Sequence, residues 1–213
     1  MKRRAYLAAA GAAGLAGLAG CKGMVAPGAG RHLLGPDTDE RWVAVAQVDD
    51  VVDEHDVRME VELLEPVANA EHPPRITVTT TNLAPKRAIS VSEDGCCLFN
   101  RMKAGSDDPT GLWLPPPDAL APEDRTGERW VPETRGRRGY ALYGCNPRTY
   151  PGGASLTNEY EVWDDYQHRG YFPPGTYRWE EQVEVWKDPR ARSGDDPSAT
   201  FTWGFSLSVE VLE

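Results

Sequence analysis

The sequence predicts an all-β fold, an antiparallel β-sandwich of about seven to nine strands. Segments with an apolar residue at every second position recur along the chain, and this is the period of a strand with one buried face. The chain also contains 18 prolines and 21 glycines, so few segments could hold a helix for ten residues. Strands separated by turn residues, without intervening helices, are typical of an antiparallel sandwich.

The first expected strands lie between residues 41 and 81. Residues 41–48 (RWVAVAQV) are rich in valine, and residues 57–64 (VRMEVELL) alternate apolar with charged side chains. Residues 75–81 (RITVTTT) are mostly β-branched, which favours a strand. The connection 49–56 is strongly charged.

A hairpin and a long proline-rich loop are expected next. Residues 88–92 and 97–102 flank an Asp-Gly pair, which is a frequent hairpin turn. Residues 103–139 contain six prolines, and we expect a long loop with short strands only at 111–114 and 129–131. A loop of this length is unusual inside a compact domain and is often functional or disordered.

Strands are expected to resume after the loop, at residues 140–143, 155–163, 176–186 and 200–212. The last of these has the clearest alternation. Its expected buried face consists of Phe201, Trp203, Phe205, Leu207, Val209 and Val211.

One short motif refines this fold class. The segment Tyr171-Phe172-Pro173-Pro174-Gly175-Thr176-Tyr177 resembles the Pro-Gly-x-Tyr start of the penultimate strand in immunoglobulin-like domains. The resemblance implies that the Tyr177 hydroxyl closes a corner against the preceding connection. More loosely, residues 41–213 resemble the immunoglobulin-like domains of uncharacterised archaeal lipoproteins, which implies an immunoglobulin-like sandwich.

The N-terminus has the pattern of a signal peptide. Lys2, Arg3 and Arg4 precede an uncharged stretch, residues 5–20, that is rich in Ala, Gly and Leu. This stretch is short and glycine-rich for a membrane-spanning helix, so residues 1–20 are expected to be a leader. Arg3 and Arg4 resemble the twin-arginine export signal, which addresses folded proteins for translocation.

The end of the leader resembles a lipobox. Leu18-Ala19-Gly20-Cys21 implies cleavage before Cys21 and a lipid on its sulfur, so we expect the protein to be anchored in the cell membrane and to face outside the cytoplasm. The alternative is an ordinary signal peptide, with Cys21 an incidental thiol. Residues 21–40 are rich in Gly and Pro and are expected to form a flexible tether to a domain at 41–213.

The charge of the chain limits its partners. Removal of the three positive charges of the leader takes the formal net charge from −10 to −13. Nucleic acid is therefore not an expected partner, because phosphate binding needs a clustered basic surface. The acidic, lysine-poor composition resembles that of proteins from extreme halophiles; the alternative is an acidic secreted bacterial protein.

The remaining cysteines point to a disulfide. Outside the cytoplasm disulfides persist, and with Cys21 lipidated we expect Cys145 to pair with Cys97 or with Cys96. A bond from Cys97 would close a loop of about 48 residues and stabilise the domain by roughly 4 kcal/mol on the chain-entropy model. Alternation does not choose between the two, because Leu98 and Phe99 are both apolar, and we prefer Cys97.

Catalytic and metal-binding motifs are not found in the sequence. Neither G-x-S-x-G nor H-E-x-x-H occurs, and the four histidines (His32, His55, His72 and His168) are expected in loops. The cysteine spacing does not match a zinc site. Calcium is the alternative for two acidic groups, but their spacing fits no known loop and we expect no metal and no cofactor; the residues concerned are Asp49, Asp50, Asp53, Glu54, Asp56, Asp164 and Asp165.

Trp113 and Trp130 in the long loop are candidate ligand contacts, since exposed aromatic residues on loops often anchor a partner. The alternative is that both fold back and cover the sandwich. Together these features predict a lipid-anchored, non-enzymatic binding or structural module at the cell surface, with a protein or a carbohydrate as its partner. The competing prediction is a metal or redox accessory protein, or an enzyme, that uses Cys96, Cys97 and Cys145.

Overall fold

The computed structural model describes residues 40–90, 106–117, 125–132, 147–165, 170–192 and 194–212. Nearly all regular structure in these ranges is antiparallel β-strand. The exception is one 3-10 turn, η1 (Asp53–His55), in the charged connection. The predicted all-β sandwich is therefore confirmed. Within the same ranges, no helix is long and apolar enough to cross a membrane.

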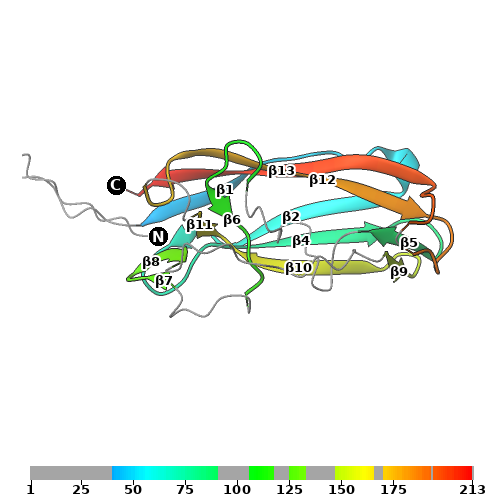
Figure 1. The fold of residues 1–213 in the computed structure, drawn as a ribbon, viewed down its shortest axis with the longest axis horizontal. Coiled ribbons are helices and arrows are strands. Elements are labelled where there is room, and N and C mark those ends of the chain that lie inside the picture. The colour runs from blue at the N-terminus through cyan, green and yellow to red at the C-terminus, as the bar shows by residue number, and fades with distance from the viewer. Residues whose placement is uncertain are drawn as a thin grey trace, which may run out of the picture. The chain divides into compact units, whose positions relative to one another are not determined.

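Two sheets make up the sandwich (Figure 1). The larger sheet contains, in spatial order, β3 (Val67–Ala68), β1 (Arg41–Val48), β13 (Ala199–Val211), β12 (Gly175–Trp186), β5 (Arg87–Ser90) and β9 (Arg148–Tyr150). The smaller sheet contains β10 (Ser155–Glu161), β4 (Arg75–Asn82) and β2 (Val57–Glu65). Two additional pairs join β6 (Leu112–Trp113) to β11 (Trp163–Asp164), and β7 (Arg125–Thr126) to β8 (Arg129–Pro132).

The strand order is that of an immunoglobulin-like sandwich. In immunoglobulin domains strands A, B and E share one sheet and strands C, F and G share the other. Here β2, β4 and β10 occupy the places of A, B and E, while β5, β12 and β13 occupy those of C, F and G. Strand β1 is an addition that pairs antiparallel with β13 along the outer side.

The core lies between the inner faces of the two sheets. Trp203, Phe205 and Leu207 of β13 are fully buried, and the indole of Trp179 stacks on Phe205 with 5.3 Å between ring centroids. Ile76 and the other inward side chains of β4 meet them from the smaller sheet. The alternation predicted for residues 201–211 is confirmed, except that Val211 is 46% exposed because it extends beyond the core.

The two ends of the sandwich are defined by the pairing partners of β13. Strand β13 pairs through Val211 with Arg41, where the described chain begins, and through Ala199 with Val185, where the β12–β13 hairpin loop starts. We call these the Glu40 end and the hairpin end. At a rise of about 3.3 Å per residue, the 13 residues of β13 separate them by roughly 40 Å. The connections 83–86 and 151–154 also lie at the hairpin end, and the connection 49–56 runs to it from the middle of β13, where Val48 lies opposite Phe205.

Differences from the predicted strands occur where pairing is short. The strand expected at 155–163 is divided at Val162 into β10 and β11, which belong to different sheets. Strands β3, β7 and β9 are two or three residues long and leave no periodic signal. The strands expected at 97–102 and 140–143 lie outside the described residues.

Candidate functional site

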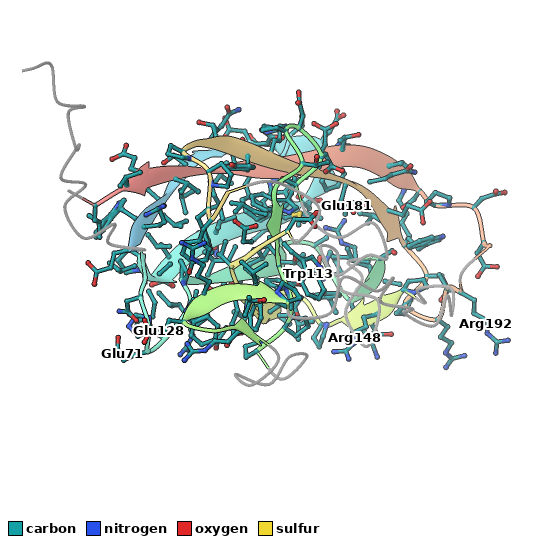
Figure 2. The ribbon with its side chains drawn as sticks, turned by 60° about the vertical axis from the view of Figure 1, so that its left-hand side comes forward. Glu71, Trp113, Glu128, Arg148, Glu181 and Arg192 are labelled. Carbon is teal, nitrogen blue, oxygen red and sulfur yellow. The ribbon has the colours of Figure 1, made fainter. Side chains whose placement is uncertain are left out.

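The two tryptophans of the long loop are buried. Trp113 and Trp130 are each 3% exposed, and Trp113 lies within the fold in Figure 2. The Trp130 indole donates a hydrogen bond to the Asn69 carbonyl (2.7 Å) and packs edge-on against Trp163. Neither side chain is therefore an exposed anchor for a ligand. The alternative, in which both tryptophans fold back and cover the sandwich, is confirmed. Burial of an indole removes a large apolar area from water, which favours this arrangement.

Backbone hydrogen bonds hold the first described part of the long loop, residues 106–117, against the sandwich. The Asp107 N–H donates to the Arg178 carbonyl (2.6 Å), and the Arg178 N–H donates to the Asp108 carbonyl (3.1 Å). The loop thus covers part of the edge of β12 that β5 leaves unpaired. Further along, the Asp165 N–H donates to the Gly111 carbonyl (3.0 Å).

The predicted tyrosine corner is present. The Tyr177 hydroxyl donates to the Pro173 carbonyl at 2.6 Å, four residues upstream. Its ring lies directly on Gly111, where an added Cβ would be 2.7 Å from the ring carbon Cε1. Glycine at position 111 therefore allows the loop to pass over the corner.

Next to this corner, two neighbouring carboxylates are buried. Asp164 is 1% exposed and Asp165 is 3% exposed, both at the end of the short β11 pairing. The Asp164 carboxylate accepts a hydrogen bond from the backbone N–H of Phe172. Phe172 is fully buried and has a φ of 43°, a left-handed conformation that a bulky residue rarely adopts. The carboxylate therefore fixes an unfavourable turn.

The environment of Asp164 shifts its ionisation. Burial raises the pKa of Asp164 to about 7, and the neighbouring Asp165 adds to the shift. The hydrogen bond from Phe172 and the charges of Arg129 and Arg41 oppose the rise in pKa. Burial, together with Asp164, also raises the pKa of Tyr177.

Tyr171 joins Arg41 of β1 to Arg129 and Trp130 of the long loop. The guanidinium carbons of Arg41 and Arg129 lie 5.7 Å and 5.4 Å from the Tyr171 ring centroid, within the range of cation–π attraction. The Arg41 Nε donates to the Tyr171 carbonyl (3.3 Å). The Tyr171 hydroxyl accepts from the backbone N–H of Trp130 (3.3 Å). The Asp164 cluster, defined as Arg41, Arg129, Trp130, Asp164, Tyr171 and Phe172, therefore fastens the loop to the Glu40 end.

The Asp164 cluster has the chemistry of a structural site. A general base or nucleophile must reach its substrate, whereas Asp164 is buried and bonded to backbone. Its raised pKa is a property that active sites also show, but structural networks produce it as well. From the sequence, Asp164 is expected only as an alternative calcium ligand. Its position directly after the apolar residues Val162 and Trp163 is the signal that could have predicted its burial.

In the acidic connection 49–56, the carboxylate of Asp49 is bonded to an arginine. Asp49 accepts two hydrogen bonds from the Arg178 guanidinium, and this contact raises the pKa of Arg178. In the part of the chain that the structure describes, no three His, Cys, Asp or Glu side chains converge as metal ligands. His55 stacks on Phe201, and His72 is bonded to Asn69.

The predicted lipidation, signal and disulfide positions lie outside the described residues. They are Arg3, Arg4, Cys21, Cys96, Cys97 and Cys145, as are His32 and His168. The described strands on either side of the cysteine-containing segments, β5 and β9, pair with each other, with Ile89 opposite Arg148.

No protein-family model, curated protein or solved structure matches this chain.

Proposed function

We propose that the protein is a lipid-anchored extracytoplasmic β-sandwich that acts as a non-enzymatic binding or structural module at the cell surface. The observation that carries this proposal is the order of residues 1–21: a twin-arginine pair, an uncharged stretch of small residues, and Leu-Ala-Gly-Cys. Cleavage before Cys21 and lipidation of its sulfur would leave the folded domain outside the cytoplasm. A diacylglyceryl group supplies the two chains that stable anchoring needs.

The tether length suits such a module. Nineteen residues separate Cys21 from Arg41, the first residue of β1. If they behave as a flexible chain, their end-to-end distance averages about 24 Å and reaches about 65 Å at full extension. The domain would stay near the membrane while its surface remains free to meet a partner.

A non-enzymatic role is supported by how the described polar groups are used. Asp164 fixes a turn, Asp49 binds Arg178, and the Asn82 amide is bonded to neighbouring loops and to strands β5 and β9. We propose a protein or a carbohydrate as the partner and exclude nucleic acid, because the mature chain is strongly acidic.

Fractionation of cells that express the Cys21→Ser variant tests the anchor. The wild-type protein should remain with membranes after a high-salt wash and dissolve only in detergent, whereas Cys21→Ser should be released into the medium. Cys145→Ser is the matched control, because it removes a cysteine without touching the lipobox and should stay membrane-bound. Retention of Cys21→Ser on membranes would contradict the proposal.

A thiol count separates this function from the competing metal or redox role. With Cys21 lipidated and one disulfide formed, the denatured wild-type protein should titrate one free thiol per chain. Reduction should raise the count to three. A metal bound in stoichiometric amount and released with the thiols would instead support the use of Cys96, Cys97 and Cys145 as a reactive centre.

A further inference from the structure

Of the seven tryptophans of the chain, only Trp42 is exposed. All seven lie in the described residues. Six of them are at most 4% exposed, whereas Trp42 of β1 is 39% exposed. An exposed indole leaves a large apolar area in contact with water, which favours its burial against another surface.

Trp42 lies at the Glu40 end among other apolar side chains. In the pairing of β1 with β3 it is opposite Val67, which is half-buried. In the pairing of β1 with β13, Val211 is opposite Arg41, the residue before Trp42. Val211 is 46% exposed, so the end of β13 adds a second exposed apolar side chain next to the start of β1.

The end of β2 lies beside the same place. The Val43 N–H donates a hydrogen bond to the Pro66 carbonyl (2.7 Å), which joins the segment after β2 to the start of β1. Leu64, two residues before Pro66, is 38% exposed. We call this group the apolar corner: Trp42, Leu64, Val67 and Val211.

The apolar corner contains most of the exposed large apolar residues that the structure describes. Five such residues are found in the described ranges, and three of them, Trp42, Leu64 and Val211, belong to the corner. The other two are Val52 and Leu83, in the connections 49–56 and 83–86. Single exposed apolar residues are ordinary, whereas a group at one place favours a contact surface.

The position of the tether selects what this surface contacts. Residues 22–39 run directly into Glu40, and β1 begins and β13 ends at the same end of the sandwich (Figure 1). A flexible chain of this length averages about 24 Å, which is shorter than the roughly 40 Å between the two ends of the sandwich. A lipid on Cys21 would therefore hold the Glu40 end, rather than the hairpin end, close to the bilayer.

The charges at the Glu40 end oppose other occupants more than they attract this one. In the described residues, four carboxylates and one guanidinium are exposed there: Glu40, Glu71, Glu128, Glu210 and Arg129. Figure 2 shows Glu71 and Glu128 on the side of the β7–β8 pair. A second copy would bring two acidic ends face to face, and their charges would repel each other. Uncharged or well-screened headgroups do not meet this repulsion.

We propose that the apolar corner is a membrane-contact surface, on which the folded domain rests with Trp42 at the headgroup level of the bilayer. This inference rests on the proposed function, since the lipid of Cys21 brings the corner to the membrane. Tryptophan is enriched at membrane–water interfaces because its ring is apolar and its N–H is polar. The tether gives the corner a high effective concentration at the bilayer, so a weak contact is enough to orient the domain.

Quenching of Trp42 by brominated lipid tests the contact. The lipidated protein is reconstituted into phosphatidylcholine vesicles whose acyl chains carry bromine near the headgroups, in about 1 M salt, where the screening length is about 3 Å. Bromine quenches the indoles that touch lipid, and the other six tryptophans are buried. Emission should fall by up to about one seventh relative to unbrominated vesicles, if the seven indoles emit alike. Trp42→Phe, which keeps an aromatic ring, should show no such loss.

Three further variants and one control measurement sharpen the test. Leu64→Ser combined with Val211→Ser should reduce the quenching of Trp42 at least about twofold, because it removes apolar area from the corner. Leu83→Ser, at the hairpin end, should leave the quenching unchanged. Circular dichroism should show that the variants fold, and flotation of the vesicles reports the anchor separately.

The outcomes distinguish the contact from the anchor. A protein that floats with the vesicles but shows no bromine quenching would overturn the contact and leave the anchor intact. Quenching that persists in Trp42→Phe would overturn it as well. A protein that does not float would refute the anchor, and the contact with it. Absence of quenching, together with a Cys21→Ser dimer that Trp42→Ser abolishes, would assign the corner to a second copy instead.

Discussion

At the residue scale, the burial of Asp164 determines how the domain responds to pH. Its pKa in the folded protein is about 7, whereas an aspartate in an unfolded chain titrates near pH 4. Between these values the unfolded chain has lost the proton that the folded chain still holds. This contribution to the free energy of unfolding is therefore fully present below about pH 4, decreases as the pH rises, and is lost above about pH 7.

Replacement of Asp164 by Asn should remove this dependence on pH. The amide oxygen can still accept the hydrogen bond from Phe172, but the side chain no longer titrates. The difference in free energy of unfolding between variant and wild type should grow in favour of the variant by about 1.4 kcal/mol per pH unit between pH ~4 and ~7. Urea unfolding at a series of pH values measures it.

Asp50→Asn is the control for this comparison, because it removes an exposed carboxylate that does not belong to the Asp164 cluster. Its pH profile should follow that of the wild type. Identical profiles for Asp164→Asn and the wild type would show that Asp164 is ionised in the same way in the folded and unfolded chains.

At the element scale, strands β12 and β13 approach each other too closely for a side chain at Gly204. A Cβ built there would lie 2.2 Å from the Trp179 carbonyl oxygen and 3.1 Å from the Arg178 guanidinium. Both strands are hydrogen-bonded along their length. Neither can move away without disturbing the pairing, which runs from Gly175 opposite Val209 to Val185 opposite Ala199.

Gly204→Ala should therefore destabilise the domain by about 3 kcal/mol or more, beyond the usual cost of overpacking, because the obstructing atom belongs to the backbone. Thermal unfolding followed by circular dichroism measures the loss. Thr202→Ala, two residues earlier on the exposed face of β13, should cost less than about 1 kcal/mol. Equal effects of the two substitutions would mean that the strands can separate at this position.

The longer strands could be predicted from sequence because their pattern is local. The alternation in 57–64 and 200–212 records which side chains face the core, and β2 and β13 lie there with boundaries shifted by one residue. The motif ending at Tyr177 likewise predicted the corner bond to Pro173. The short pairings β6–β11 and β7–β8 depend on contacts between distant segments, which leave no period in the sequence.

At the scale of the whole molecule, the candidate site was less predictable than the fold. Trp113 and Trp130 stand among prolines in a long loop, and nothing in their immediate sequence distinguishes an exposed side chain from one that covers the sandwich. Trp113 pairs with Trp163, and Trp130 packs on Trp163 and bonds to Asn69, and both partners are far away in the chain.

The net charge of the molecule predicts a dependence on salt. After removal of the leader the formal charge is −13, and these charges repel one another in the compact state. The screening length falls from about 30 Å at 0.01 M to about 3 Å at 1 M salt. The urea midpoint of the folded domain should therefore rise between these concentrations of sodium chloride, and a midpoint that falls would contradict the halophile-like interpretation of the composition.

The lipid anchor is the central claim, and the mass of the mature protein tests it most directly. The protein should be purified from membranes in detergent and its N-terminal peptide analysed by mass spectrometry. We predict that the chain begins at Cys21 and carries a diacylglyceryl-type lipid on the Cys21 sulfur. A mature protein whose Cys21 is an unmodified thiol, or one that still carries residues 1–20, would contradict it.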